Sequence, residues 1–498
     1  MSDKRQNNKT DVLLISPPWY RFFGQQFSAK PLGLCSLAAL LEKEGFNVGV
    51  YNADLEPGAH FTQALSTIAN FKTYLSRVSD LGDSVWRDIK NTITTLNPSL
   101  VGISVVTAKY KSALTLAELI KQINPRIKII AGGIHPTLCP EEMLKTGVFD
   151  YVVRGEGEYT ILDLLNALKN GNPVRQIKGL SFTENGNIIH NPDRELIENL
   201  DTLPWSANRL ILNKKDMVPD DFAHLIASRG CPYNCIFCAS YKLWTHRVRC
   251  RSPKNIVDEI KMIKEQYSPI YFYFQDDSFT INKDFVHRLC EQMINEQLKV
   301  RWVCETRADL VTDELIKMLH RAGCFKIVLG AESGNEATLS RINKQVTKGQ
   351  IRDAVRICKK NGLETSLYFM IGFPWETEKE INDTVRMMEE LDPQYAVFSV
   401  ATPYPGTELY SICQNEKLLP DSLDWSTFFH QSPEMFLTNK LTREQTKKII
   451  EEVAKKFVAH NKKKHRLELL NPYRLCREIK RFYKQPKEIL SKLKYIIR

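Results

Sequence analysis

The feature that most constrains the fold is a repeated alternation of short apolar segments with amphipathic helical segments. In the first part of the chain the apolar segments are VLLIS (12–16), VGVY (48–51), LVGISVV (100–106), IKIIAGG (127–133) and YVVRG (151–155). Helical spacing lies between them, as at 109–123 and 158–169. Strands that are apolar on both faces need helices on both sides of the sheet. We therefore expect an α/β domain with a doubly wound parallel sheet of flavodoxin or Rossmann type.

A second series of the same kind begins near residue 223. Its apolar strands are HLIAS, IYFYFQDD, RWVCETR, KIVLGAES, TSLYFMIGFP and YAVFSVATPYP. Amphipathic helices separate them, for example at 255–266, 312–322 and 350–361. Six such units predict a partial (β/α)6 barrel of TIM type, whose chemistry lies at the carboxyl ends of the strands.

These patterns divide the chain into four parts. We expect the doubly wound domain over residues 1–175, a hairpin and linker over 176–222, the barrel over 223–415 and a helical, basic region over 416–498. The hairpin prediction rests on an Asn-Gly pair in KGLSFTENGNIIH, which is typical of a two-residue turn.

Three of the twelve cysteines lie within the segment SRGCPYNCIFCAS, at Cys231, Cys235 and Cys238. A structural zinc site needs a fourth protein ligand, and a thioredoxin-type pair needs only two thiols. Three thiolates suit a [4Fe–4S] cluster in which the fourth iron stays open for a small molecule. We expect the other nine cysteines to be buried thiols, because disulfides are rare in the cytoplasm.

The spacing Cys-x3-Cys-x2-Cys, with Phe237 before the last cysteine, resembles the radical S-adenosylmethionine (SAM) superfamily. The resemblance extends through the barrel units to about residue 415. It implies that the open iron chelates the amino and carboxylate groups of SAM. In that family one electron from the cluster cleaves the sulfonium, and the resulting 5′-deoxyadenosyl radical abstracts a hydrogen atom. An electron donor such as flavodoxin or ferredoxin is then required.

The resemblance also implies a set of SAM-binding residues at the strand ends. They are Phe237, Gln275, Asp276, Asp277, Arg307, Glu332, Ser333 and Gly372. The Gln-Asp-Asp segment would hold the amino group, Glu332 and Ser333 the ribose or carboxylate, and Arg307 the carboxylate. The segments GFP (372–374) and TPYPGT (402–407) would line the adenine and substrate. Ordinary turn glycines and salt-bridged carboxylates remain the alternative, and no catalytic side chain is assigned.

The first sheet carries neither G-x-G-x-x-G nor G-x-x-x-x-G-K-[ST], so nucleotide binding lacks its phosphate turn. A radical SAM barrel follows this domain in the sequence, and together they resemble B12-binding radical SAM proteins, in which the first domain binds cobalamin. The segments that carry the resemblance are SPP, PLGLCSLAALLEKEG, AGGIHPT and RGEGE. The implied cobalamin contacts are Ser16, Pro17, Thr107, Gly132, Gly133, His135, Thr137 and Glu156. The motif D-x-H-x-x-G is absent, so we expect His135 to lie in a loop as a contact and not as the cobalt ligand. The alternative is a domain that has kept the cobalamin-binding fold and lost the cofactor.

Two reactions fit these cofactors. One is methylation of an unactivated carbon, with methylcobalamin as the methyl donor, which we favour. The other is a radical cyclisation, ring rearrangement or oxidation of a small molecule or lipid without methyl transfer. A redox sensor would not need a barrel that encloses SAM. A methylthiotransferase would carry a second cysteine triad before the barrel, which this sequence lacks.

The net charge of +11 is concentrated at the C-terminus. Residues 462–498 hold 13 Lys and Arg against 3 acidic residues, so the rest of the chain is nearly neutral. The segment is either a helix pair that docks on the barrel or a basic amphipathic anchor on anionic lipid. No stacking platform accompanies it, so we expect no nucleic-acid partner. Without a signal peptide or a long apolar span, the expected location is the cytoplasm, with peripheral contact at the inner membrane face as one option.

Overall fold

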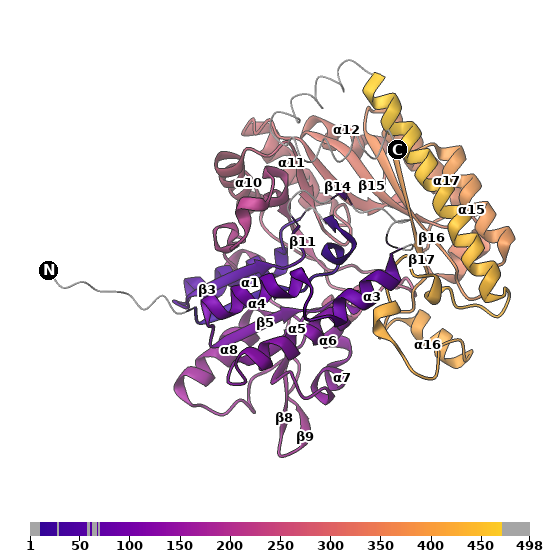
Figure 1. The fold of residues 1–498 in the computed structure, drawn as a ribbon. Coiled ribbons are helices and arrows are strands. Elements are labelled where there is room, and N and C mark those ends of the chain that lie inside the picture. The colour runs from indigo at the N-terminus through magenta and orange to yellow at the C-terminus, as the bar shows by residue number, and fades with distance from the viewer. Residues whose placement is uncertain (1–9, 27–28, 57–59, 62–66, 68–69, 471–498) are drawn as a thin grey trace. The chain divides into compact units, whose positions relative to one another are not determined.

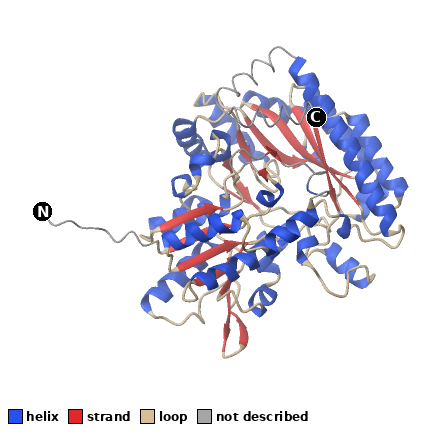
Figure 2. Cartoon of the chain, in the orientation of Figure 1, coloured by secondary structure: helices blue, strands red, loops and turns tan. Residues whose placement is uncertain are grey.

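The computed structural model describes residues 10–26, 29–56, 60, 61, 67 and 70–470. The chain forms two compact units. The first comprises Met1–Pro57, Phe71–Ile197 and Thr202–Met217, and the second comprises Gly58–Asn70, Glu198–Asp201 and Val218–Arg498. Each unit is an α/β structure with its own sheet (Figures 1 and 2).

The first unit is built on a sheet of seven strands. Their order is β3 (Val48–Asn52), β1 (Val12–Ser16), β5 (Leu100–Ser104), β6 (Lys128–Gly132), β7 (Tyr151–Val153), β8 (Leu180–Glu184) and β9 (Asn187–His190). The first five strands are parallel, with Val12 opposite both Val48 and Leu100. This order is that of flavodoxin, in which the chain reverses direction across the sheet between β1 and its neighbour β5. The predicted doubly wound sheet is therefore confirmed.

Helices surround this sheet because their sequences present one apolar face. They are α1 (Leu32–Lys43), α3 (Phe71–Ser79), α4 (Ser84–Leu96), α5 (Tyr110–Ile123), α6 (Ile134–Leu138), α7 (Pro140–Lys145) and α8 (Gly157–Asn170). In α4, the Asp83 carboxylate accepts the backbone N–H of Val85 and so caps the first turn. The helix ends at Asn97, which adopts the left-handed conformation.

The hairpin and much of the expected linker belong to the first unit. Strand β8 pairs antiparallel with β7, so the hairpin extends the sheet. The turn residues Asn185 and Gly186 both have positive φ, 50° and 78°, as a two-residue turn of type I′ requires. Farther on, Leu212 donates its N–H to the carbonyl of Val50 at 2.8 Å. The first unit therefore reaches Met217, whereas the sequence pattern placed its boundary at 175.

The second unit contains six parallel strands. Their order is β10 (His224–Leu225), β13 (Phe272–Phe274), β14 (Trp302–Arg307), β15 (Cys324–Glu332), β16 (Glu364–Ile371) and β17 (Tyr395–Val400). The helices between them are α9 (Ser240–Trp244), α10 (Pro253–Tyr267), α11 (Lys283–Asn295), α12 (Asp313–Arg321), α13 (Glu336–Arg341), α14 (Lys348–Lys360) and α15 (Glu378–Leu391). The six predicted βα units are all present, in chain order.

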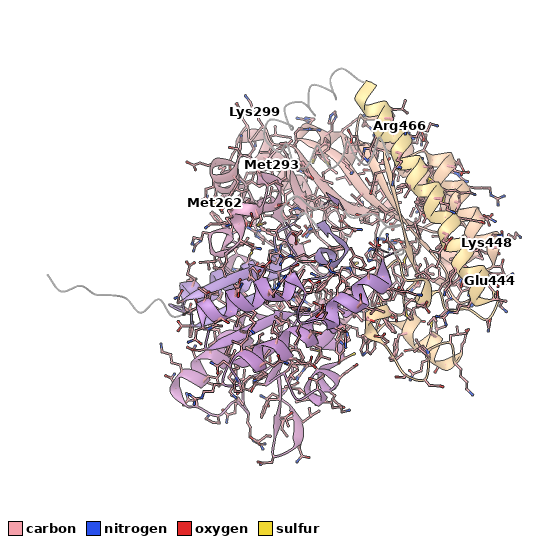
Figure 3. The ribbon with its side chains drawn as sticks, viewed as in Figure 1. Met262, Met293, Lys299, Glu444, Lys448 and Arg466 are labelled. Carbon is pink, nitrogen blue, oxygen red and sulfur yellow. The ribbon has the colours of Figure 1, made fainter. Side chains whose placement is uncertain are left out.

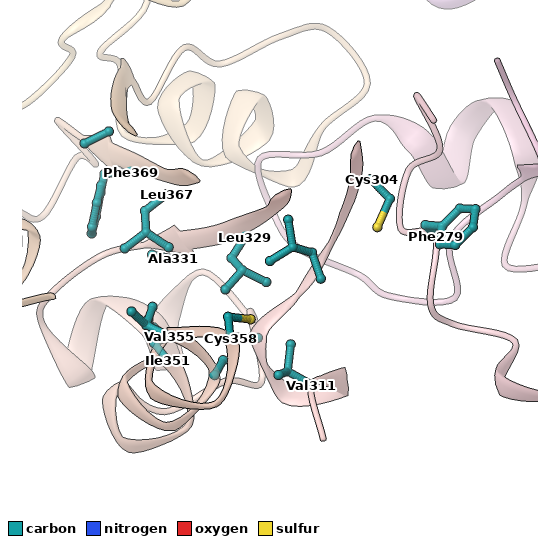
Figure 4. Close-up of a cluster of buried hydrophobic side chains, with 14 of the residues drawn as sticks. Phe279, Cys304, Val311, Leu329, Ala331, Ile351, Val355, Cys358, Leu367 and Phe369 are labelled. Carbon is teal, nitrogen blue, oxygen red and sulfur yellow. The ribbon is translucent and has the colours of Figure 1, made fainter. Parts of the chain in front are cut away.

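Side chains on one face of this sheet form a closely packed core. Figure 4 shows Ile351, Val355 and Cys358 of α14 opposite Leu329 and Leu367 of the strands. All five are buried, and each fully buried aliphatic side chain contributes about 1.5–3 kcal/mol to folding. Helices therefore cover this face of the barrel sheet.

The alternate strand positions point to the opposite face, which is more open and more polar. Tyr273, Glu305 and Lys326 are half-buried, and the ring of Tyr368 is 38% exposed. The hydroxyl of Tyr273 donates to the Glu305 carboxylate at 2.6 Å. Interiors of complete barrels are usually filled with branched apolar side chains. This face therefore presents polar side chains where complete barrels have mostly apolar ones.

The C-terminal helix α17 (Arg443–Leu470) docks on the barrel. Its residues Ile450 and Phe457 join the core, and the Phe457 ring lies 5.3 Å from that of Phe398. The side chain of Asn461 exchanges two hydrogen bonds with the backbone of Ala396 and so covers the exposed edge of β17. Figure 3 shows Glu444, Lys448 and Arg466 along the helix.

Between the last barrel strand and α17 lie α16 (Glu408–Asn415) and short 3-10 turns at Trp425–Thr427 and Pro433–Met435. The helical region expected from residue 416 therefore begins at Arg443. The amphipathic pattern predicted for the tail falls mostly on 471–498, outside the described residues. In the described part of the chain, no helix has the length and apolar character needed to cross a membrane.

Candidate active site

The three cysteines lie in a loop between β11 (Ser228–Arg229) and α9 (Ser240–Trp244). Gly230 precedes them with φ of 110°, and a Cβ at this position would come within 2.0 Å of the Arg247 carbonyl oxygen. Only glycine fits there. Inside the loop, Cys238 donates its N–H to the Cys235 carbonyl at 3.0 Å. The loop therefore curls tightly and brings the three thiols together.

Burial raises the pKa of each thiol, to about 12 for Cys238, and the neighbouring Asp277 raises the pKa of Cys231 and Cys238 further. Donors oppose this effect at each sulfur. The backbone N–H of Tyr233 bonds Cys231, and that of Ser240 donates to Cys238 Sγ at 3.4 Å. Three clustered thiols with N–H donors are the ligand set that an iron–sulfur cluster uses, and cluster binding removes the thiol protons. The loop therefore fits a [4Fe–4S] cluster.

Arg307 lies beside this loop and binds it to the barrel. Its Nη1 donates to Cys235 Sγ at 3.9 Å, and the guanidinium lies 3.5 Å from the centre of the Tyr233 ring. The remaining N–H groups bond Asp309 and the Lys344 carbonyl, the latter at 2.5 Å. The guanidinium therefore holds the loop through protein partners, and its contact with the SAM carboxylate stays a prediction.

A buried ion pair, which the sequence pattern did not reveal, adjoins the same cysteine. Lys344 Nζ lies 2.7 Å from Glu332 Oε1, and the two side chains are only 8% and 9% exposed. Glu332 has φ of 60°, a strained left-handed conformation for a residue with a side chain. Lys344 also lowers the pKa of the Cys235 thiol against the larger effect of burial. No local motif marks Lys344, because its partner lies 12 residues earlier in the chain.

Two of the predicted SAM contacts have structural roles. The Asp276 carboxylate accepts the backbone N–H groups of Ala227 and Ser228 and the Ser228 hydroxyl. Ser333 is fully buried, 3.2 Å from the Thr384 hydroxyl. Both side chains thus hold strand ends together, and their contact with SAM stays a prediction. Asp277 is exposed beside the thiols and Gln275 is half-buried, so these two remain candidates for the SAM amino group.

The GFP segment is shaped by a carboxylate that the sequence analysis missed. Gly372 has φ of 86°, and its N–H donates to Glu376 Oε2 at 2.8 Å. Glu376 also accepts the N–H of Phe373, and burial raises its pKa to about 7. The Phe237 ring lies 6.3 Å from that of Phe373. The predicted position Phe237 therefore lies beside Phe373, the residue after the predicted position Gly372.

In the first unit, several predicted cobalamin contacts share one edge of the sheet. Ser16 ends β1, Thr107 follows β5, and Gly132 ends β6, so all three lie at the carboxyl ends where α/β sheets bind ligands. Gly133 has φ of 105°, and a Cβ there would lie 2.9 Å from the Val105 carbonyl oxygen. Glycine is therefore needed for this close approach of the two loops.

Lys109, which the sequence analysis did not single out, ties the first of these loops down. Its Nζ bonds the Pro17 carbonyl at 3.0 Å and the Asp54 carboxylate at 2.8 Å. The loop after β1 is thereby fixed to the loop after β3 and to α5.

The remaining three predicted contacts differ from expectation in part. His135 lies in the short helix α6, not in a loop, and is fully buried with Nδ1 3.2 Å from the Thr107 hydroxyl. Burial lowers its pKa to about 4, so the imidazole is neutral at pH 7. The Thr137 hydroxyl accepts the N–H of Gly155. Glu156 is buried and accepts the backbone N–H of Ile197 at 2.7 Å, a structural role.

Two family comparisons agree with these two units. The B12 binding domain matches residues 26–165, and the radical SAM superfamily matches residues 225–388. A Pyrococcus horikoshii protein named as an uncharacterized methyltransferase is 33% identical over 449 residues, which cover 88% of this chain and 90% of the relative. The chain belongs to the B12-binding radical SAM family. Its cofactors are accordingly a [4Fe–4S] cluster, SAM and cobalamin.

Other relatives of this radical SAM enzyme differ in their named reactions. The anaerobic magnesium-protoporphyrin IX monomethyl ester cyclase of Rubrivivax gelatinosus is 33% identical over 65% of this chain and 60% of the relative. The hopanoid C-3 methylase of Methylococcus capsulatus is 25% identical over 76% and 68%. Among solved structures, the methyltransferase TsrM of Kitasatospora setae matches with a TM-score of 0.64, at 17% identity over 83% of this chain and 78% of TsrM. The structural match supports the fold.

Proposed function

We propose that this enzyme methylates an unactivated carbon of a small-molecule substrate. The observation that carries the proposal is the loop of Cys231, Cys235 and Cys238, which supplies three clustered thiols at the end of a barrel in a chain that also has a B12-binding domain. The Pyrococcus horikoshii relative, which this chain matches over 90% of the relative's length, is named as an uncharacterized methyltransferase. A single methylation of this kind uses both cofactors, which explains why the two domains occur in one chain.

When bound, the cluster and SAM supply a 5′-deoxyadenosyl radical that removes a hydrogen atom, and methylcobalamin supplies the methyl group. The protein's own part is to hold and orient. The three thiolates bind the cluster, Arg307 fixes their loop, and Asp277, beside the thiols, is the candidate for the SAM amino group. We assign the substrate to the open face of the barrel sheet, where Tyr273, Glu305 and Tyr368 lie.

Cyclisation without methyl transfer is the second candidate. The cyclase of Rubrivivax gelatinosus supports it at the same identity of 33%, but over 338 residues against 449 for the methyltransferase relative. We therefore place methylation first. A low-potential donor such as flavodoxin or ferredoxin would reduce the cluster in either case. The named substrates of the relatives include a tetrapyrrole and a hopanoid, so a lipid substrate is also within this proposal.

The test is a product analysis with anaerobically reconstituted enzyme. Enzyme, cobalamin, a reductant and SAM with a trideuterated methyl group are incubated with the small-molecule and lipid extract of the host cell. Methylation predicts that S-adenosylhomocysteine and 5′-deoxyadenosine both form, together with a product that carries the deuterated methyl group. 5′-Deoxyadenosine with an unlabelled product and no S-adenosylhomocysteine would support cyclisation. The variant with all three cysteines changed to Ala is the control and should form neither.

A further inference from the structure

A second group of metal-binding side chains lies in the first unit, away from the cysteine loop in the sequence. Donor atoms of His135, Cys139 and Glu142 all lie within 4.8 Å of one another. His135 is buried, and the other two are half-buried. None of the three belongs to the cysteine motif of the radical SAM unit.

Local structure brings these three side chains together. Cys139 joins α6 to α7, and its N–H donates to the His135 carbonyl at 2.8 Å. Its own carbonyl accepts the N–H of Met143 at 3.4 Å, so Cys139 ends α6 and begins α7. Its φ and ψ of −130° and 56° are not helical, so the helix is interrupted there. The interruption and the two adjoining turns bring the donor atoms of the imidazole, thiol and carboxylate within 4.8 Å of one another.

The imidazole is also held in a fixed orientation. His135 Nδ1 lies 3.2 Å from the Thr107 hydroxyl, and the Tyr110 ring meets the imidazole edge-on at 5.1 Å. Histidines that bind metals usually have their other ring nitrogen fixed in this way by an oxygen atom. The ring cannot turn away from its neighbours without losing both contacts.

We propose that His135, Cys139 and Glu142 bind one Zn²⁺ ion. Imidazole, thiolate and carboxylate are the three side-chain ligands that zinc takes in proteins, and a water molecule or hydroxide completes the tetrahedron. On binding, the Cys139 thiol releases its proton to solvent, and the charges of the thiolate and the carboxylate balance the 2+ charge of the ion.

This site has a consequence for the cofactor edge of the sheet. His135 is the second residue of α6, and the loop residue Gly133, which links β6 to α6, lies two positions before it. Zinc would fasten the start of α6 to α7 and so fix that loop. The ion is distinct from the iron of the cluster, because the three cluster cysteines lie in the other unit. The proposal does not depend on which reaction the enzyme catalyses.

The test measures X-ray absorption at the zinc edge on the full-length holoenzyme. The holoenzyme can be used because this absorption edge distinguishes zinc from the iron and cobalt of the cofactors. Protein from cells grown with zinc should contain about one zinc per chain, with one sulfur and three nitrogen or oxygen neighbours. Cys139→Ala and Glu142→Gln should each lower the affinity for added Zn²⁺ at least about tenfold. Glu141→Gln, on the exposed side of the same helix, is the matched control and should bind zinc as the wild type does.

Circular dichroism and cluster iron content establish that each variant is folded. A folded wild-type protein that contains no zinc and takes up none from added Zn²⁺ overturns the proposal. So does zinc binding that the Cys139 and Glu142 variants leave unchanged. A spectrum with two or three sulfur neighbours would place the zinc on the cluster cysteines and would equally overturn it.

Discussion

Replacing Lys344 with Met tests the importance of the buried ion pair beside the cluster. The substitution removes the cation and leaves the Glu332 carboxylate, with its side chain only 9% exposed, without its partner 2.7 Å away. Breaking a buried pair in this way costs about 3–5 kcal/mol. Taking up a proton limits the loss, because protonating an ordinary glutamate at pH 7, against a pKa of about 4.3, costs about 3.7 kcal/mol. We therefore expect a loss of about 3–4 kcal/mol at pH 7.

The pH dependence gives the sharper test. Where the carboxyl group that has lost its lysine is protonated in the folded variant, the free-energy cost of that protonation falls by about 1.4 kcal/mol for each pH unit of acidification. The folded variant then holds a proton that its unfolded state lacks, so its deficit relative to the wild type shrinks from pH 7 to pH 6. Urea unfolding under anaerobic conditions, followed by tryptophan fluorescence and circular dichroism, measures this difference. The double variant Lys344→Met with Glu332→Gln should recover part of the lost stability.

The control is Lys360→Met, which removes a lysine that is 62% exposed and lies 3.2 Å from Asp313. Exposed pairs of this kind contribute about 0–1 kcal/mol. If Lys344→Met loses no more stability than Lys360→Met, or if its deficit is the same at pH 6 and pH 7, the buried pair does not have the importance that we assign to it.

Three further predictions follow from the described contacts, and a fourth concerns the basic tail. Changing the three cysteines of the loop to Ala should abolish both cluster absorbance and reductive SAM cleavage; SAM cleavage by this variant would contradict the cluster assignment. Gly230→Ala should lower cluster occupancy sharply, because the new Cβ would meet a backbone carbonyl at 2.0 Å; iron analysis that shows normal occupancy would contradict this. Electron paramagnetic resonance of the Co(II) cobalamin form should lack nitrogen coupling from a histidine, because His135 is buried and faces Thr107; histidine coupling would show that the cobalt is ligated after all. Deleting residues 471–498 should weaken sedimentation with anionic liposomes at low salt if the basic tail is an anchor. The deletion starts after Leu470 because Asn461 and the rest of α17 hold the barrel edge, and equal partitioning of the two proteins would rule the anchor out.

The sequence alone determined the features that depend on neighbouring residues. Apolar strands alternating with amphipathic helices predicted both sheets. Strands that are buried on two faces are apolar throughout, and the helices that cover them are apolar on one face, so both can be found from the spacing of apolar residues. The Asn185-Gly186 turn was predictable because both positions require positive φ. The spacing of the three cysteines predicted the cluster loop, since all three ligands come from one short segment.

Tertiary structure decided what depends on distant residues. Asp276 and Asp277 are adjacent in the sequence, yet the Asp276 carboxylate accepts the backbone N–H groups of Ala227 and Ser228, whereas the Asp277 carboxylate accepts that of Gly230 beside the thiols. The spacing of apolar residues does not show which residues a strand end contacts in the folded chain. In the same way, no local pattern showed that Glu332 pairs with Lys344, which lies beyond α13 in the chain. The energy of a buried charge depends on what surrounds it in space, so only the folded chain assigns these roles.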